Sequence, residues 1–329
     1  MTQIGPRLGI DLGGTKIEAV VLRADGVAIW RERSATPAGN YEATIASIAS
    51  TVANAQRQIG ATVSVGIGMP GTISLRTGLV KNANSTVLNG KPLKHDIERA
   101  LSCAVRLQND ANCFAYSEAI DGAGRDALTV FGVILGTGVG AGVVINRELL
   151  VGVNSIAGEW GHNPLPPASQ LGFIDDRVRE RLSLESPGPA CYCGRYGCVE
   201  SWLSGTGFAA DYRRLAAQVD AATSLPVDSS SRQADAADII ARMRSGDVIA
   251  IKAFDAYVDR LARALAGVIN IVDPQVIVLG GGMSKVDELY QRLPMALPRY
   301  VFSDDLRTRI LPPVHGDASG VRGAAWLWN

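Results

Sequence analysis

Three of the five cysteines in this 329-residue chain lie within one short stretch, "CYCGRYGC", which runs from Cys191 to Cys198. Clustered thiolates on one loop indicate a zinc site, because a structural zinc ion takes four sulfur or nitrogen ligands in a tetrahedron. Three thiols leave one position for another residue, and they cannot all pair as disulfides. The odd total of cysteines favours a reducing compartment in which thiols stay available to a metal.

The fourth ligand is expected to be a histidine, and the chain has three: His95, His162 and His315. His162 lies closest to the cysteines, in the loop-like stretch "AGEWGHNPLP". We therefore expect a site made of four residues: His162, Cys191, Cys193 and Cys198. Four protein ligands leave no open coordination position, so the ion would hold structure and would not activate water.

Two glutamates flank the expected metal loop. Glu159 lies three residues before His162, and Glu200 lies two residues after Cys198. Carboxylates accept hydrogen bonds from hydroxyl groups in a directional way, so a loop that a metal holds in place predicts a polyol or sugar site. The alternative is that both are solvated surface residues.

A candidate catalytic base follows in "RLQNDANCF", where Asn109 and Asp110 stand at the end of an expected strand and the start of a helix. In phosphoryl transfer a carboxylate accepts the proton of the attacking hydroxyl group. Asn109 adds an amide donor and acceptor beside it. Because aspartate is also a favoured N-cap residue, a purely structural role for Asp110 would explain the pattern as well.

Three glycine clusters each follow an apolar strand: Gly13-Gly14, Gly136–Gly142 and Gly280–Gly282. Glycines let several backbone N–H groups point into one concavity, which is how phosphates are bound, although each cluster alone is also typical of a tight turn. Asp11 could hold Mg²⁺ beside the first cluster. Thr15 and Lys16 could contact phosphate oxygens, with a solvated turn lysine as the alternative for Lys16.

The sequence lacks the motif of P-loop proteins and does not fit that of dinucleotide-binding proteins, so both classes are excluded. The chain has no G-x-x-x-x-G-K-[ST] sequence, so it is not a P-loop protein. The stretch "GTGVGA" matches the dinucleotide pattern, but it leads into the strand-like "AGVVI" where the dinucleotide fold requires a helix.

The elements that must position these residues alternate between strand and helix. Apolar runs at 8–12 and 17–22 predict one hairpin, and the stretch 128–145 predicts another. The segments that begin at Gly9 and Gly132 are weakly alike, which indicates a duplicated unit. Helical periodicity marks "YEATIASIASTVANAQRQIG", a long tract over 236–270 and the C-terminal end. The pattern predicts an α/β protein.

The balance of charged residues and the lengths of the apolar runs limit which kinds of partner the protein can have. Lys plus Arg equals Asp plus Glu at 32 each, which removes the electrostatic case for nucleic acid or an anionic membrane. No apolar run reaches the roughly 20 residues needed to cross a bilayer. The N-terminus shows no basic-then-apolar export pattern, and we expect a cytoplasmic protein.

Taken in order, the motifs "GIDLGGTK", "GIGMPG", "NDAN", "GTGVGAG", "GEWGH", "CYCGRYGCVE" and "VIVLGGGMS" resemble the ROK family of sugar kinases and repressors. The resemblance implies the actin/hexokinase-like (ribonuclease H-like) duplicated α/β fold, with two domains and a central cleft. We expect one domain over 1–115, rejoined by a C-terminal helix at 316–329, and a second over 116–315 that carries the zinc loop.

The resemblance also implies the site. Asp110 matches the general base of the family, and ATP, Mg²⁺ and a structural Zn²⁺ are the implied cofactors. The sugar would contact Asn84, Asn109, Asp110, Glu159, His162 and Glu200. ATP would lie on Asp11, Gly13, Gly14, Thr15, Lys16, Gly136, Thr137, Gly138, Gly281 and Gly282. Zinc would bind His162, Cys191, Cys193 and Cys198, and the family leads us to expect a homodimer.

Within the family, "KNANSTVLNGKPL", "AGEWGHNPLP" and "HGDASGVRGAAWLW" look most like bacterial fructokinases that also accept mannose. We therefore expect ATP-dependent phosphorylation of the 6-hydroxyl of fructose. A glucokinase or N-acetylglucosamine kinase is the alternative, and polyphosphate could replace ATP as donor. From other classes, a catalytically silent sugar-sensing regulator and a zinc-binding interaction module remain open. Because the first strand begins within ten residues, we expect no DNA-binding segment.

Overall fold

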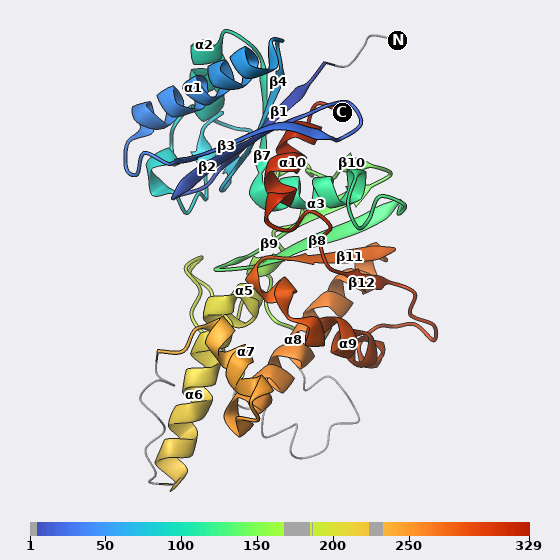
Figure 1. Ribbon diagram of the computed structural model, residues 1–329. Helices are drawn as coiled ribbons and strands as arrows, with labels where there is room; N and C mark the ends of the chain where they lie inside the picture. The colour runs from blue at the N-terminus through green and yellow to red at the C-terminus, as the bar shows by residue number, and fades with distance from the viewer. Residues whose placement is uncertain (1–4, 168–184, 186, 224–232) are drawn as a thin grey trace. The chain divides into compact units, whose positions relative to one another are not determined.

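Two five-stranded sheets organise the protein. The computed structural model describes residues 5–167, 185, 187–223 and 233–329 (Figure 1). The strand order is β3-β2-β1-β4-β7 in the first sheet and β10-β9-β8-β11-β12 in the second. The first sheet contains β1 (Arg7–Leu12), β2 (Lys16–Leu22), β3 (Ala28–Ala35), β4 (Ser64–Met69) and β7 (Val105–Asn109). The second contains β8 (Thr129–Leu135), β9 (Val139–Ile145), β10 (Glu148–Leu149), β11 (Val276–Gly280) and β12 (Arg309–Leu311).

Both sheets follow one plan, which confirms the duplicated actin/hexokinase-like fold. In the first, β1 and β2 form an antiparallel hairpin, and β1 then pairs in parallel with β4 and β4 with β7. In the second, the β8–β9 hairpin occupies the place of β1–β2, and β11 and β12 follow in parallel. The two predicted glycine hairpins are therefore present, while the central cleft stays a prediction.

Helices cover both faces of the first sheet. On one face α1 (Tyr41–Ile59) and α2 (Leu93–Leu101) bury the strands' apolar side chains, in a core that includes Ile10, Ile48 and Ile97. On the other, α3 (Asp110–Ile120) and α10 (Ser319–Trp326) pack together. α10 lies directly on the strands, because a Cβ at Gly9 would overlap the Val321 carbonyl and one at Gly66 the Ala324 carbonyl.

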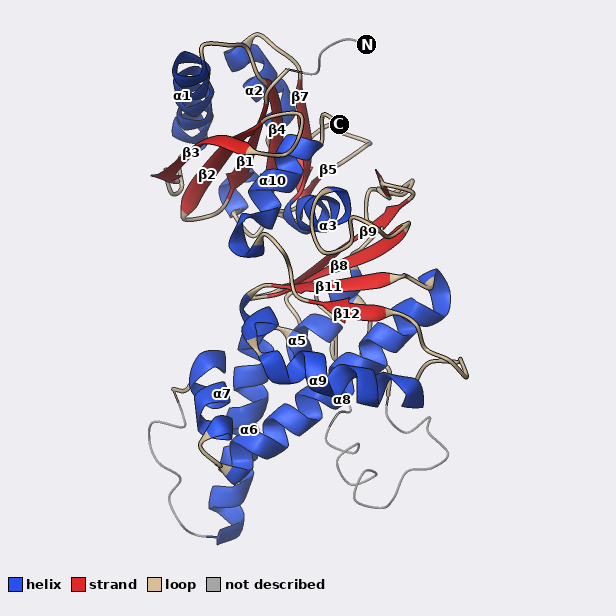
Figure 2. Ribbon diagram, turned by 45° about the vertical axis from the view of Figure 1, so that its right-hand side comes forward, coloured by secondary structure: helices blue, strands red, loops and turns tan. Residues whose placement is uncertain are grey.

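The second sheet is accompanied by a group of helices centred on the long α8 (Val248–Val272) (Figure 2). Four helices pack against it: α5 (Val199–Leu203), α6 (Gly205–Thr223), α7 (Ala236–Arg244) and α9 (Asp287–Ala296). The single helical tract expected over 236–270 is wrong. The chain breaks after α7 because Gly246 adopts a φ of 91°, and Asp247 then caps a new helix by accepting from the N–H groups of Ile249 and Ala250.

Two compact units divide the chain. One comprises Met1–Gly132, Gly142–Gly158 and Pro313–Asn329, and the other comprises Val133–Ala141 and Glu159–Pro312. The domain boundaries expected from the sequence, 1–115 with 316–329 and 116–315, stay a prediction. Among the described helices, none combines the length and apolarity of a membrane-spanning segment.

Candidate active site and metal centre

The four expected metal ligands come together in the second unit. The ligand atoms of His162, Cys191, Cys193 and Cys198 all lie within 4.8 Å of one another. The Sγ atoms of Cys193 and Cys198 are 3.7 Å apart, and Cys191 Sγ lies 3.6 Å from His162 Nδ1. Metal–ligand bonds of 2.0–2.3 Å in a tetrahedron place sulfurs about 3.8 Å apart and sulfur and nitrogen about 3.5 Å apart. The residues therefore fit zinc.

Local backbone geometry shapes this loop. Gly194 and Gly197 adopt φ angles of 86° and 67°, which an L-residue with a side chain rarely does, so the chain can turn sharply between the thiols. Cys191 N–H donates to the Arg195 carbonyl at 2.8 Å, and this closes the turn. The Arg195 side chain hydrogen-bonds to Cys193 and lowers the pKa of that thiol to about 6, which favours the thiolate form that binds metal.

Both ring nitrogens of His162 face the metal loop. Nδ1 points to Cys191, and Nε2 lies 2.9 Å from the Tyr192 hydroxyl, a contact that fixes the ring orientation. His162 stands at the end of a short 3₁₀ turn, Trp160–His162, whose buried indole donates to the Ala264 carbonyl at 3.3 Å. The geometry supports a metal-ligand role, whereas the sugar contact expected of the same residue stays a prediction.

Buried arginines of α8 tie both ends of this region to the rest of the unit. Arg263 binds Glu185 through both carboxylate oxygens at 2.9 Å and also donates to the Pro166 carbonyl. Arg260 bonds to Glu185 and to Asp211, at 2.8 and 2.7 Å. Pro166 follows His162 and Glu185 precedes Cys191, so one ion-pair cluster holds the chain on both sides of the ligands.

Glu200 connects the metal loop to a glycine turn. One of its carboxylate oxygens accepts from the Val139 N–H at 2.9 Å, and the other lies 4.0 Å from Cys191 Sγ. A Cβ at Gly138 would come within 2.7 Å of that first oxygen, so glycine is required there for space. Glu159 is exposed, and its carboxylate is therefore available to a ligand.

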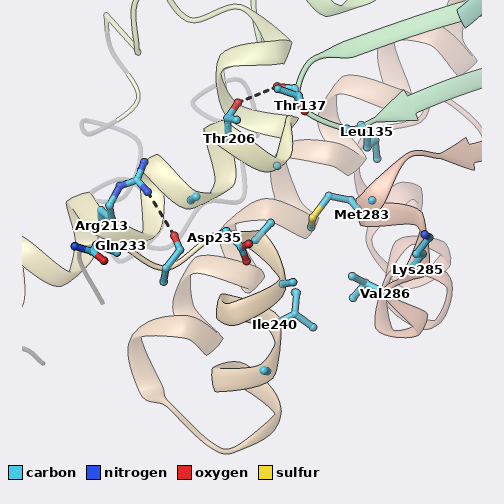
Figure 3. A pocket seen from close by; sticks show the side chains of 18 of the residues that line it. Leu135, Thr137, Thr206, Arg213, Gln233, Asp235, Ile240, Met283, Lys285 and Val286 are labelled. Carbon is cyan, nitrogen blue, oxygen red and sulfur yellow. Dashed lines mark hydrogen bonds between the residues drawn. The ribbon is translucent and has the colours of Figure 1, made fainter. Parts of the chain in front are cut away.

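A cavity of about 730 Å³ opens beside the same turn (Figure 3). Gly136, Thr137 and Gly282 line it, as expected for nucleotide contacts, whereas Gly138 and Gly281 do not. Gly281 has a packing role instead. A Cβ there would lie 2.5 Å from the Leu135 carbonyl oxygen, so only glycine lets the two glycine turns lie this close together. The remaining wall is mostly apolar and includes Ala209, Ala237, Ile240, Met283 and Val286.

Sequence reasoning missed this apolar wall. Its members come from α6, α7 and the turn after β11, and Arg213 and Lys285 add positive charge to it (Figure 3). In the sequence these residues look like ordinary helix positions, since nothing there indicates that the helices meet around a space. A cavity of this size with an apolar wall and glycine turns can hold a purine base and present backbone N–H groups to phosphates.

In the first unit, Asp11 and Asp110 form an acidic pair. Burial raises the pKa of Asp11 to about 6, and the neighbouring carboxylates of Asp110 and Glu18 add to this rise. A divalent cation would relieve this repulsion, and the role of Asp11 as a Mg²⁺ ligand stays a prediction. The adjoining residues, Gly13 to Thr15, form the β1–β2 turn, and Lys16, the first residue of β2, pairs with Glu18 at 3.2 Å.

The N-cap of α3 is Asn109, which corrects the cap role considered for Asp110. Asn109 Oδ1 accepts from the N–H groups of Ala111 and Asn112, and Asp110 is the first helical residue. Asp110 Oδ1 also lies 2.8 Å from the Ala111 nitrogen. Asn109 is therefore the N-cap, Asp110 Oδ1 shares the Ala111 N–H with it, and the role of Asp110 as a base stays a prediction.

The expected sugar contacts are divided between the units. Asn84, Asn109 and Asp110 belong to the first unit, and Glu159, His162 and Glu200 to the second. Asn84 is exposed, and Asn109 Nδ2 donates to the Gly71 carbonyl at 3.1 Å. The sugar-contact role expected of these six residues stays a prediction.

Comparison with known proteins places these features in a family. Over 319 residues the chain is 40% identical to the N-acetyl-D-glucosamine kinase of Pectobacterium atrosepticum and 39% identical to that of Escherichia coli O6:H1. These alignments cover 97% of this chain and 97% and 98% of the relatives. The expectation of a fructokinase is not supported, because these relatives are named N-acetyl-D-glucosamine kinases, which was the alternative expectation.

Solved structures agree with the fold. A ROK hexokinase from Thermus thermophilus superposes with a TM-score of 0.77 at 27% identity, covering 97% of this chain and 96% of the other. A ROK family glucokinase from Streptomyces griseus, solved with glucose and AMPPNP, gives a TM-score of 0.73 at 27% identity, with 98% and 99% covered. The prediction of a ROK sugar kinase is thereby confirmed. Residues 7–329 match the ROK family, and the chain belongs to it.

Proposed function

We propose that this protein is an ATP-dependent hexose kinase that phosphorylates the 6-hydroxyl of N-acetyl-D-glucosamine. The observation that carries the proposal is the 40% identity to an N-acetyl-D-glucosamine kinase over 97% of both chains. The stretches that favoured fructose are short, whereas this likeness runs through both units. Mannose, glucose and fructose become secondary acceptors.

Asp110 acts as the general base in this proposal. Asp110 lies in the first turn of α3, directly after the Asn109 cap, and in this proposal its carboxylate accepts the proton of the attacking hydroxyl. Asn84, Asn109, Glu159 and Glu200 bind the remaining hydroxyl groups. Asp11, beside Asp110, holds Mg²⁺, which when bound supplies charge neutralisation for the phosphates.

The cavity of the second unit binds the nucleotide. Its apolar wall suits the adenine base, and the turns that contain Gly136, Thr137 and Gly282 bind phosphates through backbone N–H groups. The Cys₃His set holds zinc, which when bound fixes the loop between Glu159 and Glu200. The zinc is structural, because its four ligands come from the chain.

The test is coupled ADP release with Mg²⁺ at equal concentrations of N-acetylglucosamine, glucose, mannose and fructose. We expect the highest kcat/KM with N-acetylglucosamine. A higher kcat/KM with fructose would restore the fructokinase interpretation. No ADP release with any hexose, by protein that binds the sugar in calorimetry, would favour the silent sensor. Homodimer formation, proposed from the family, is checked by light scattering.

A further inference from the structure

We propose that Asn89 is a positioning residue that holds Asn84 in place to bind the sugar, an inference that rests on the proposed function. The Asn89 side chain pairs with both backbone groups of one residue, Ala83. The Ala83 N–H donates to Asn89 Oδ1 at 2.9 Å, and Asn89 Nδ2 donates to the Ala83 carbonyl at 2.8 Å. This two-bond amide ring closes a short loop, and Asn84 is the first residue inside it.

The same loop is held from its other side by Gly71. Gly71 has a φ of 72°, and a Cβ there would lie 2.7 Å from the Ala83 nitrogen and would overlap the Lys81 carbonyl oxygen. The Gly71 carbonyl accepts from Asn109 Nδ2 at 3.1 Å. A continuous series of contacts therefore runs from Asn109 through Gly71 and Ala83 to Asn89. It fixes the spacing of the two asparagines assigned to the sugar.

On its C-terminal side Asn84 is followed by the 3₁₀ turn Thr86–Leu88, in which the Leu88 N–H donates to the Ser85 carbonyl at 3.0 Å, and the amide ring is the contact that holds its N-terminal side. Asn82 has a positive φ of 59°, which is strained for a residue other than glycine. Ala83 is buried, but Asn84 is exposed, and the next fully buried anchor in the loop is Leu88. Removing the ring leaves the buried N–H and C=O of Ala83 without their partners and frees the loop to take other conformations.

The experiment compares Asn89→Ala with a matched control, Asn270→Ala. Asn270 also bridges a loop with its amide, which accepts from the Phe302 N–H at 2.9 Å and donates to the Tyr300 carbonyl at 3.4 Å. It belongs to the other unit, and neither it nor its partners are assigned to a ligand. Steady-state kinetics with N-acetylglucosamine and with ATP are measured for both variants, and thermal unfolding is recorded.

We expect Asn89→Ala to lower kcat/KM for the sugar by about tenfold or more, mainly through KM, since one or two hydrogen bonds are lost. The KM for ATP should change by less than about twofold, and Asn270→Ala should leave sugar kinetics unchanged. In an Asn84→Ala background, Asn89→Ala should cost little more, because its effect passes through Asn84. If the alanine variant does not fold, Asn89→Asp replaces it in the same kinetic assays. Aspartate keeps the acceptor for the Ala83 N–H and loses only the donor to the Ala83 carbonyl.

The outcomes separate the two proposals. Wild-type protein that phosphorylates no hexose contradicts the proposed function. An active wild type whose sugar kcat/KM survives Asn89→Ala overturns the positioning role. Equal losses for ATP and sugar, an equal loss in the Asn270 control, or additive effects with Asn84→Ala would each overturn it too, since they indicate a general structural effect.

Discussion

Glu118, a fully buried carboxylate on α3, offers the sharpest test of how the first unit is held together. Its Oε2 accepts from the N–H groups of Ala123 and Val314, at 2.9 and 3.1 Å. Its Oε1 accepts from the Ser319 hydroxyl at 2.7 Å and the His315 N–H at 3.4 Å. One side chain thus joins α3, which begins at Asp110, to the segment that starts α10. We expect Glu118→Gln and Glu118→Ala to destabilise this unit to different extents.

The geometry sets the size of each effect. In Glu118→Gln the amide oxygen must take the Oε2 position, because two backbone N–H groups point there and cannot turn. The NH₂ group then faces Ser319, whose hydroxyl can rotate and accept, and only the long bond from His315 is lost. One orphaned buried donor costs about 1–3 kcal/mol. Glu118→Ala orphans the three backbone N–H donors, while the Ser319 hydroxyl can still donate to the Gly316 carbonyl at 2.9 Å, and it leaves a cavity, so the cost should be about 4 kcal/mol or more.

Urea unfolding followed by tryptophan fluorescence measures both variants, since Trp326 is buried in the same unit. Exposed Glu148→Gln, a change of the same chemistry, is the control and should stay within about 0.5 kcal/mol of wild type. Equal destabilisation by Gln and Ala would refute the orientation argument. Wild-type stability in both would refute the claim that this carboxylate holds α10.

Three further predictions concern the site. Cys193→Ala should lose the one zinc expected per chain and weaken sugar binding, and elemental analysis of fresh wild-type protein that finds no zinc would contradict it. Asp110→Asn should lower kcat by about 10²–10⁴-fold while nucleotide binding and folding survive, and near wild-type turnover would show that the residue is no base. Ala237 is an exposed helix residue that lines the cavity, so Ala237→Phe should fill part of the nucleotide site. The KM for ATP should rise about tenfold or more while the KM for the sugar stays unchanged, and unchanged ATP kinetics would show that the nucleotide binds elsewhere.

The cluster of one histidine and three cysteines and the duplicated hairpins were predictable because their signals are local. Three of the four residues lie in the short segment from Cys191 to Cys198, and His162 is the histidine nearest to it in the sequence. Their spacing was therefore enough to predict four residues around one metal ion. The hairpins follow from glycines between apolar runs. Even the missed break after α7 has a local cause in Gly246 and Asp247, and the periodic pattern on either side concealed it.

The sequence by itself determined the family, the fold class and which side chains are candidates for the site. These conclusions come from motifs and periodic patterns, which involve residues close together in the chain. Only the tertiary structure decided which groups meet. The apolar cavity arises where α6, α7 and two glycine turns converge, and residues such as Ile240 and Met283 look in the sequence like ordinary core. The role of Asn89 is equally hidden, because "NG" reads as a turn until Ala83 is seen to pair with it. The cavity depends on packing between separate segments and the amide ring on the path of one loop in space, and residue spacing encodes neither.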